Sequence, residues 1–335
     1  MRTVLFFRNY KAFHGGHLKV WNYFNHVLNL PDFAPRIWFS DQSELDGENP
    51  WRDAHDVIVD QEHPIRPDVY FVGGANWRLL DRYPDADPSL PVINLIQHVR
   101  HVDPDRKLAK FLKRKAIRIC VSAEVADELR ANGSTTGPLI VIPNAIDLAD
   151  LPAPNGSEPQ VDVLIAAGKE PEMGIRVADR LAREGRVVNV LLERIPRREF
   201  LDRMRGARIT VYLPHETEGF FLPALEGMAL GTLVVCPDCI GNRSFCLPGH
   251  NAYRPNYTVD DVVRDTEAAL ALPPDRAEQL RETARRTADE HSLSREREAF
   301  WDVLQNVDQL WEGTNAVREQ PTTVYEGVGP RSARP

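Results

Sequence analysis

Short, uninterrupted apolar segments recur along the chain, and they constrain its fold more than any other feature. In the first half these segments are rich in Val, Ile and Phe, and they occur at 3–7, 36–40, 68–72, 92–96, 118–122 and 139–142. The stretches between them, near 17–29, 75–83, 105–115 and 123–132, have helical patterns. Strands without polar alternation are typical of a parallel sheet that helices cover on both faces. The first half therefore predicts a doubly wound α/β domain.

The same alternation begins again after residues 148–160, which are rich in Pro, Gly, Asn and Ser and predict a linker. A strand at 161–168, a helix at 172–185 and further strands and helices follow, the last strand being at 233–236. From Thr258 onward the pattern is almost entirely helical. The repetition predicts two Rossmann-like, doubly wound domains that face a central cleft, where the carboxyl ends of the strands meet.

The expected domain boundaries follow from this pattern. Residues 1–150 are predicted to form the N-terminal domain and 151–295 the C-terminal domain. We expect a C-terminal helix at 296–312 to pack back on the N-terminal domain. Residues 313–335 have little to pack and are expected to be a disordered tail.

Composition narrows the class of protein. Charged residues make up 27% of the chain and hydrophobic residues 42%, as in an ordinary globular protein. The net charge of −8 argues against a general nucleic-acid binder. No apolar run reaches the length of about 18 residues that a membrane span requires, and the N-terminus does not resemble a signal peptide. Four cysteines are too few for a disulfide scaffold, so we expect a cytoplasmic protein.

The segment HETEGFFLPALEGMALG, at 215–231, places two glutamates around an apolar run. It follows a predicted strand, and Pro223 and Gly231 suit the two ends of a helix at 222–230. Glu226 is then expected in the first turn and Glu218 in the preceding loop. Free N–H groups at such a helix start favour a phosphate, and carboxylates accept hydrogen bonds from sugar hydroxyls. Alternatively, Glu226 only complements the helix dipole and Glu218 is solvated.

This segment, EGFFLPALEGMALGTLVV, resembles the Glu-x7-Glu signature of the family 4-type retaining glycosyltransferases with the GT-B fold. Other features occur in the order that this family shows: Gly15-Gly16 after the first strand, His98 after VINLI, the segment CVSAEVADELRANG, and VIPNAID before the linker. The resemblance covers most of residues 3–310.

The resemblance implies the roles of the two glutamates. Glu218 would lie near the transferred sugar and Glu226 would bind the ribose of a nucleotide-sugar donor. The backbone from Gly219 through Phe220 and Phe221 to Leu222 would cradle the diphosphate.

The resemblance also implies roles elsewhere in the chain. Gly15 and Gly16 would approach the same phosphates without side chains, although a Gly pair can equally form a tight turn. His98 would face the reacting sugar; a single histidine at a strand end is otherwise structural. Asn242 and Arg243 belong to the glycine turn of the expected donor-binding loop.

The chain departs from the family in AAGKEPEMGIR, where the family usually has an Arg and, about five residues later, a Lys that clamp the diphosphate. Lys169 occupies the first position, and Met173 the second. Arg176, Arg243 or Arg8 would have to supply the missing cation. Otherwise Lys169 is a solvated loop lysine. Glu218, His98 and Lys169 are the expected catalytic residues.

The predicted activity is transfer of a sugar, with retention of its anomeric configuration, from a nucleotide-sugar to a hydroxyl of a glycan, lipid-linked or small-molecule acceptor. We expect no cofactor and no metal, since no acidic metal-binding motif appears. A nucleotide-sugar epimerase on the same fold, or a non-catalytic sugar-nucleotide or glycan-binding subunit, is the alternative, and Met173 favours the non-catalytic one.

Two further features allow more than one interpretation. Cys236, Cys239, Cys246 and His250 have spacing compatible with zinc, but buried, reduced thiols suit a segment that leaves a buried strand. The basic run RKLAKFLKRKAIR, at 106–118, is either a solvated helix face or a contact with an anionic glycan or with lipid headgroups at the inner face of the membrane.

Overall fold

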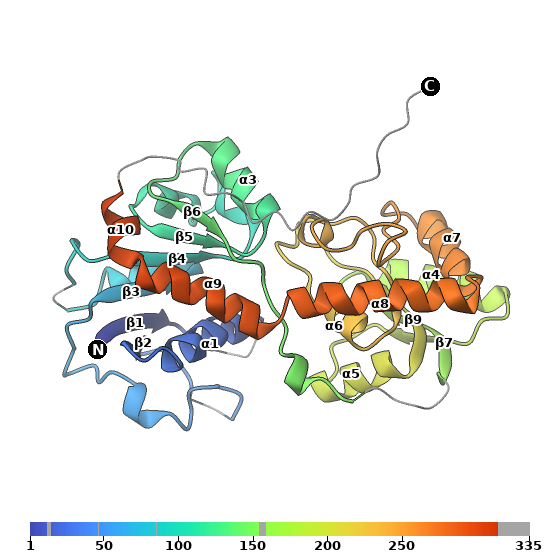
Figure 1. The fold of residues 1–335 in the computed structure, drawn as a ribbon, viewed down its shortest axis with the longest axis horizontal. Helices are drawn as coiled ribbons and strands as arrows, with labels where there is room; N and C mark the ends of the chain where they lie inside the picture. Colours follow the sequence, from blue (N-terminus) through green and yellow to red (C-terminus); the bar gives the residue numbers. More distant parts are fainter. Residues whose placement is uncertain (12–14, 46, 85, 154–158, 314–335) are drawn as a thin grey trace.

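The strands of the chain form two separate parallel sheets (Figure 1). The computed structural model describes residues 1–11, 15–45, 47–84, 86–153 and 159–313. The N-terminal sheet has the order β2-β1-β3-β4-β5-β6. Its strands are β1 (Arg2–Arg8), β2 (Phe33–Phe39), β3 (Val69–Gly73), β4 (Val92–Ile96), β5 (Ile117–Cys120) and β6 (Leu139–Val141). All six lie at or within three residues of the apolar segments that predicted them.

Alternate residues of these strands build two different cores. Val4 and Phe6 of β1 face one side, where they pack with α1 (Gly15–Leu28), α3 (Ala123–Asn132) and part of the C-terminal helices. Leu5 and Phe7 face the other side and pack with the short helix α2 (Trp77–Leu80) and the segment near Phe111. Both faces of the sheet are therefore buried, which explains why the strands lack polar alternation.

The C-terminal sheet has the order β10-β9-β7-β8. Its strands are β7 (Val161–Ala166), β8 (Val188–Leu191), β9 (Ala207–Tyr212) and β10 (Leu233–Val235). The helices of this domain are α4 (Pro171–Arg183), α5 (Arg197–Arg205), α6 (Leu222–Ala229), α7 (Val259–Leu270) and α8 (Pro274–Glu290). α4 and α7 cover one face of the sheet, and α5 and α6 cover the other. Because all its strands are parallel, their carboxyl ends lie at one edge.

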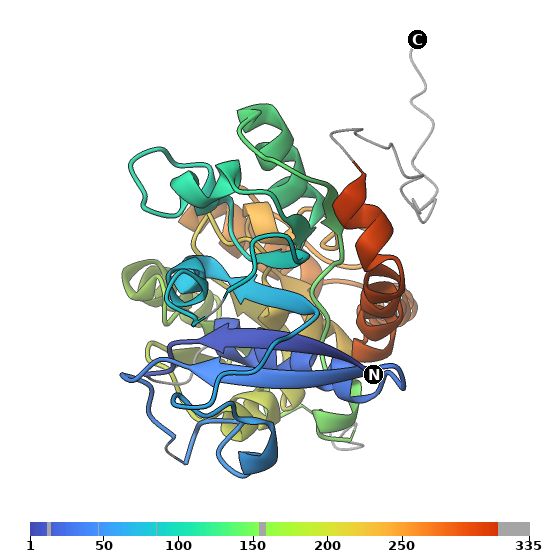
Figure 2. The same cartoon turned by 90° about the vertical axis from the view of Figure 1, so that its left-hand side faces the viewer.

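The chain passes between the two domains twice. After β6 it enters the C-terminal domain, and after α8 it returns as α9 (Leu293–Gln305) and α10 (Val307–Glu312), which lie against the N-terminal domain (Figures 1 and 2). Trp301 on α9 donates a hydrogen bond of 2.7 Å to the carbonyl of His26 on α1. The two passages touch each other, since the N–H of Ile146 donates to the carbonyl of His291 at 2.9 Å and Leu293 donates back to Ile146 at 3.1 Å.

A buried group of charges lies beside this double passage. Glu296 on α9 is fully buried and pairs with Lys19 and with His26 on α1. Its Oε2 also accepts a hydrogen bond of 3.2 Å from the N–H of Ala145 in the first passage. The carboxylate therefore joins α1, α9 and the outgoing chain at one point.

The basic segment 105–115 does not form the helix that its pattern predicts. It contains only a 3-10 turn, η4 (Ala109–Lys113). The cause is Arg118 on β5, whose buried guanidinium donates to the carbonyls of Phe111, Leu112 and Arg114 at 2.7–3.0 Å. These carbonyls are thereby turned toward the guanidinium and away from α-helical partners.

Other expectations meet the structure only in part. The helical pattern near 75–83 yields α2 and a preceding 3-10 turn. Of the linker, residues 148–150 form a 3-10 turn, and residues 154–158 lie outside the described residues, as does the predicted tail from residue 314. In the part of the chain that the structure describes, no helix has both the length and the apolar character to cross a membrane.

Candidate functional site

The two domains touch where the loop after β9 meets the end of β4. Gly219 lies so close to the backbone of the other domain that a Cβ there would be 2.2 Å from the carbonyl oxygen of Gln97. Beside it, Arg100 donates a hydrogen bond of 3.2 Å to the hydroxyl of Thr217. The loop after β9, which carries Glu218, therefore packs directly against the residues around His98 in the N-terminal domain.

Lys169 and Glu218 form an ion pair at this boundary. Lys169 follows β7 and Glu218 follows β9, so the carboxyl ends of two adjacent strands bring them together. The Lys169 ammonium also lies 5.4 Å from the ring centroid of Phe221. The Lys169 side chain is 42% exposed and that of Glu218 is 20% exposed, so both remain accessible to a ligand.

His98 faces the same cluster from the N-terminal domain. It precedes a 3-10 turn at Val99–His101, and its Nδ1 accepts a hydrogen bond of 3.2 Å from the N–H of Arg100. Burial, together with the nearby charge of Arg100, lowers the pKa of His98 to about 4, while Glu218 opposes the shift. The ring is therefore neutral near pH 7, with its proton on Nε2, and that nitrogen can donate a hydrogen bond.

Glu226 lies in the second turn of α6, because the helix begins at Leu222, one turn before it. The expected place in the first turn was wrong, so complementing the helix dipole does not explain this carboxylate. Glu226 is only 5% exposed and pairs with Arg197, the first residue of α5. Arg197 also reaches Asp150 at 3.3 Å. Burial lowers the pKa of Arg197, but Glu226 and Asp150 outweigh that effect and raise it.

Arg197 is a site residue that no sequence pattern selects. It stands in PRREF at the start of an exposed helix, next to a second arginine, where charged residues are common. Only the fold shows that one of these two arginines turns toward Glu226.

Part of the backbone expected to cradle a diphosphate already forms a hydrogen bond within the protein. The N–H of Phe221 donates to the carbonyl of Gly241 at 2.9 Å, whereas the N–H groups of Gly219 and Leu222 have no hydrogen bond within the described residues. Gly241 itself fits because it lacks a Cβ, which would lie 2.5 Å from the nitrogen of Phe220. Three of the four expected residues, Gly219, Phe220 and Leu222, therefore have no hydrogen bond from their N–H groups within the described residues.

Asn242 and Arg243, in the expected donor-binding loop, form hydrogen bonds with residues of the same loop. The amide nitrogen of Asn242 donates to the carbonyl of Pro237 at 2.8 Å, and its oxygen accepts from the N–H of Cys239 at 3.2 Å. Arg243 forms a bidentate pair with Asp238. These two residues shape the turn that carries Gly241.

The other expected cation positions lie apart from Lys169. Arg176 lines a depression of about 350 Å³ between α4 and the start of α7, together with Thr258 and Asp260. Met173 is partly buried and packs on the core between the sheet and α4. Neither side chain forms a hydrogen bond or ion pair with Glu218 within the described residues.

Gly15 and Gly16 begin α1 at the carboxyl end of β1. A Cβ at Gly15 would meet nothing within 4 Å, so no neighbour within the described residues requires glycine there. The carbonyl of Gly16 accepts a hydrogen bond of 2.9 Å from Arg8, which is buried and whose pKa burial lowers to about 10.

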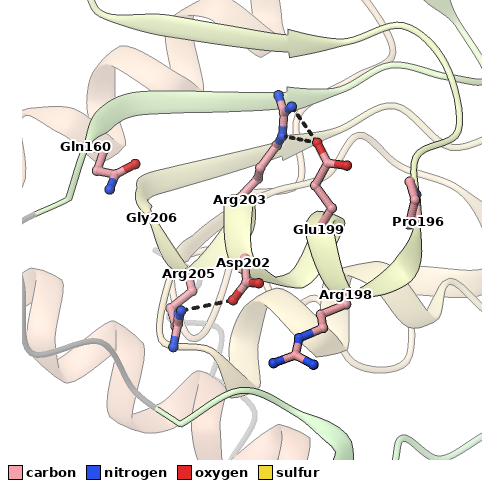
Figure 3. Close-up of a pocket in the computed structure, with 8 residues that line it drawn as sticks. All are labelled: Gln160, Pro196, Arg198, Glu199, Asp202, Arg203, Arg205 and Gly206. Carbon is pink, nitrogen blue, oxygen red and sulfur yellow. Dashed lines mark hydrogen bonds and ion pairs between the residues drawn. The ribbon is translucent and has the colours of Figure 1, made fainter.

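A second depression, of about 570 Å³, lies beside α5 (Figure 3). Its acids already have partners, since Arg203 pairs with Glu199 and Arg205 with Asp202. Arg198 is drawn at its edge without such a partner. The lining contains none of the expected site residues.

The cysteine segment contains buried free thiols. Cys236, Cys239 and Cys246 are fully buried, and burial raises the pKa of Cys236. No group of three or more His, Cys, Asp or Glu side chains suited to a metal occurs within the described residues. His250 is exposed, so the four residues of the possible zinc set are not assembled.

Comparison with known proteins gives matches in structure only. No protein-family model and no curated protein sequence matches the chain. Among solved structures, HepE from Anabaena in complex with UDP and glucose has a TM-score of 0.69 at 13% identity, covering 91% of this chain and 100% of that one. Sucrose-phosphate synthase from Thermosynechococcus elongatus has a TM-score of 0.65 at 12% identity and covers 92% of this chain and 100% of its own.

The galactosyltransferase WaaB of the lipopolysaccharide outer core gives a similar result, with a TM-score of 0.65 at 13% identity, covering 91% of this chain and 99% of that one. At such low sequence identity, structural similarity is evidence about the fold alone. Together with the two parallel sheets and the double passage between them, it shows that the chain has the GT-B fold, built from two Rossmann-like α/β domains.

Proposed function

We propose that this protein is a retaining glycosyltransferase of the family 4 type, which transfers a sugar from a nucleotide-sugar to an acceptor hydroxyl without a metal ion. The observation that carries the proposal is the cluster of Lys169, Glu218 and His98, contributed by both domains at their contact. Such a cluster on a GT-B fold suits a donor bound between the domains, and solved relatives of this fold are described with UDP and with UDP-glucose.

The reaction forms a bond between the acceptor oxygen and the anomeric carbon and breaks the bond from that carbon to the diphosphate. The acceptor proton passes to an oxygen of the departing diphosphate, on the same face of the sugar. Lys169 would stabilise the charge that develops on this leaving group. His98, neutral with a proton on Nε2, would donate to a sugar hydroxyl, and Glu218 would accept from another.

The acceptor is proposed to be a glycan or a lipid-linked acceptor that meets the N-terminal domain, with the protein working at the inner face of the membrane. Lys107, Lys110 and Lys113 are exposed and have no salt bridge within the described residues. They would attract anionic headgroups or an anionic glycan. Sedimentation with vesicles that contain anionic lipid, compared with zwitterionic vesicles, tests the membrane contact.

The test of the function is a panel of UDP-, GDP-, dTDP-, ADP- and CMP-sugars. We expect one nucleotide class to raise the Tm of the wild type, because a ligand at a hundred times its Kd adds about 2.7 kcal/mol. Slow release of free nucleotide from that donor should disappear in Glu218→Gln and persist in Arg183→Ala, an exposed control on α4.

Each result decides between the alternatives. Stabilisation with no release or transfer would favour a binding subunit, for which the apolar Met173 in the clamp is the supporting observation. Isomerised donor without transfer would identify an epimerase. Stabilisation by none of the donors would contradict the proposal altogether. NMR of a transferred product would show whether the anomeric configuration is retained.

A further inference from the structure

The pairing of Glu226 has a consequence for ligand recognition. Glu226 is almost completely buried, and a buried carboxylate without a counter-charge is strongly unfavourable. Arg197 is its only ion-pair partner within the described residues. Arg197 therefore compensates the buried carboxylate, and the orientation of Glu226 toward a ligand depends on it.

The pair uses only one of the two carboxylate oxygens. Arg197 contacts Oε1 of Glu226. Oε2 has no hydrogen bond within the described residues, and it is not among the fully buried atoms that lack a partner. It is therefore open to solvent and available to accept a hydrogen bond from a ligand.

Arg197 is itself held from a second side. It begins α5, and its Nε lies 3.3 Å from Asp150, in the chain segment that leaves the N-terminal domain. Nη2 of Arg197 has no hydrogen bond within the described residues, so the guanidinium keeps one free donor nitrogen. A planar guanidinium presents its donors in fixed directions and can therefore orient two carboxylates at once, whereas an ammonium lacks this fixed geometry.

We propose that Arg197 is a positioning residue of the nucleotide site. It orients Glu226 through Oε1, leaves Oε2 to accept a hydrogen bond from a ribose hydroxyl, and anchors this pair to the interdomain segment through Asp150. The inference rests on the proposed function, because it assigns the hydroxyl to the ribose of a bound nucleoside diphosphate. It predicts that the protein distinguishes ribonucleotides from their deoxy forms through Arg197.

The test is a double-mutant cycle measured by calorimetry. UDP, GDP, ADP and CDP are titrated into the wild type, and the tightest of them is then used with its 2′-deoxy and 3′-deoxy forms. We expect Arg197→Ala to weaken binding about tenfold, the loss typical of one charge-assisted contact. In a Glu226→Gln background the same change should alter Kd less than twofold. Arg197→Lys should recover part of the affinity, and Asp150→Asn should lose less than Arg197→Ala.

The deoxy forms separate positioning from general damage to the fold. The wild type should bind at least one of them about tenfold more weakly than the ribonucleotide, and Arg197→Ala should bind both nearly alike. Arg198→Ala is the matched control, since its side chain lines the depression beside α5 and it has no contact with Glu226 within the described residues (Figure 3). It should keep wild-type affinity and selectivity.

Unaltered binding or unaltered selectivity in Arg197→Ala would overturn this inference while the proposed function stands. Equal losses in the wild-type and Glu226→Gln backgrounds would do the same. If no diphosphate binds the wild type, the proposed function fails first and the inference with it. Should Arg197→Ala fail to fold, Glu226→Gln and the double variant must bind alike, with no preference for ribose; any difference between them would reject the coupling.

Discussion

Burial keeps two histidines beside the contact between the domains uncharged near pH 7. His98 and His101 flank one 3-10 turn, and the pKa of each falls to about 4, mainly because burial disfavours the charged ring. Lys169, by contrast, is exposed and forms an ion pair with Glu218. The contact between the domains therefore combines an uncharged hydrogen-bond donor, His98, with the ion pair of Lys169 and Glu218.

His101 should make stability depend on pH. Its pKa is about 4 in the folded protein and 6.5 in the unfolded chain, so between these values the unfolded state binds more protons. The free energy of unfolding should decrease as the pH falls from 6.5 to 4, by a contribution on the order of 3 kcal/mol. Urea titrations should show a smaller decrease in His101→Leu. An identical pH dependence in wild type and variant would contradict the buried, neutral state.

Lys169 should matter to the chemical step. Removing its charge in Lys169→Ala should lower the rate of donor turnover by about 10²–10³, the size of effect seen for one transition-state contact. Lys169→Arg should retain most of the rate. Turnover is followed by release of nucleotide from the donor found in the panel. A rate for Lys169→Ala within twofold of the wild type would exclude this role.

At the scale of elements, two loops fit together through glycines. The loop after β9 presses Gly219 against Gln97, and the turn after β10 presses Gly241 against Phe220. Neither glycine has a positive φ, so the requirement is for space and not for a left-handed backbone. Backbone-to-backbone contacts of this kind fix the loops more firmly than side-chain packing, which can adjust its rotamers.

Gly241→Ala and Gly219→Ala should therefore displace these loops. We expect each to cost roughly 1–3 kcal/mol of stability, as for other overpacked sites, and to weaken nucleotide binding as well. Gly206→Ala is the matched control, because its Cβ would meet only atoms 3.6 Å or more away. Thermal and urea unfolding measure the difference. Equal stability of all three variants would show that the loops yield without cost.

How far the sequence predicts these elements depends on how far apart in the chain the interacting residues lie. The strands are set by local composition, and the apolar segments located all six strands of the N-terminal sheet. η4 depends on hydrogen bonds that the Arg118 side chain donates to residues four to seven positions before it, and the Glu226–Arg197 pair joins residues 29 positions apart. Arg118 removes helical carbonyls from the segment before it, and Arg197 meets Glu226 29 positions later. No local pattern contains that information, which is why both were missed.

At the scale of the whole molecule, α9 belongs in space to the N-terminal domain although it follows the C-terminal domain in sequence. Its apolar side includes Phe300, which packs edge-on to Tyr23 with ring centroids 4.7 Å apart. Glu296 adds the buried pairs with Lys19 and His26. The last helices thus complete the core of the domain with which the chain begins.

Removing one partner from the buried group of Lys19, His26 and Glu296 should lower the free energy of unfolding. Lys19→Met leaves Glu296 buried with His26 as its remaining side-chain partner within the described residues, and we expect a loss of about 3–5 kcal/mol of stability. The double variant Lys19→Met, Glu296→Leu should recover most of it, because an apolar pair needs no compensation. Urea unfolding monitored by tryptophan fluorescence gives both values. A double variant less stable than Lys19→Met would show that the charges stabilise the fold outright.

Because α9 and α10 pack on the N-terminal domain, noncovalent contacts hold the two domains together in addition to the covalent chain. If residues 1–150 and 151–313 were made as two polypeptides, the second would still carry the helices that complete the first, and Arg2 would still find Asp308. The two pieces should therefore assemble into an active heterodimer when they are produced together. Each domain alone would expose an apolar surface that its partner normally covers.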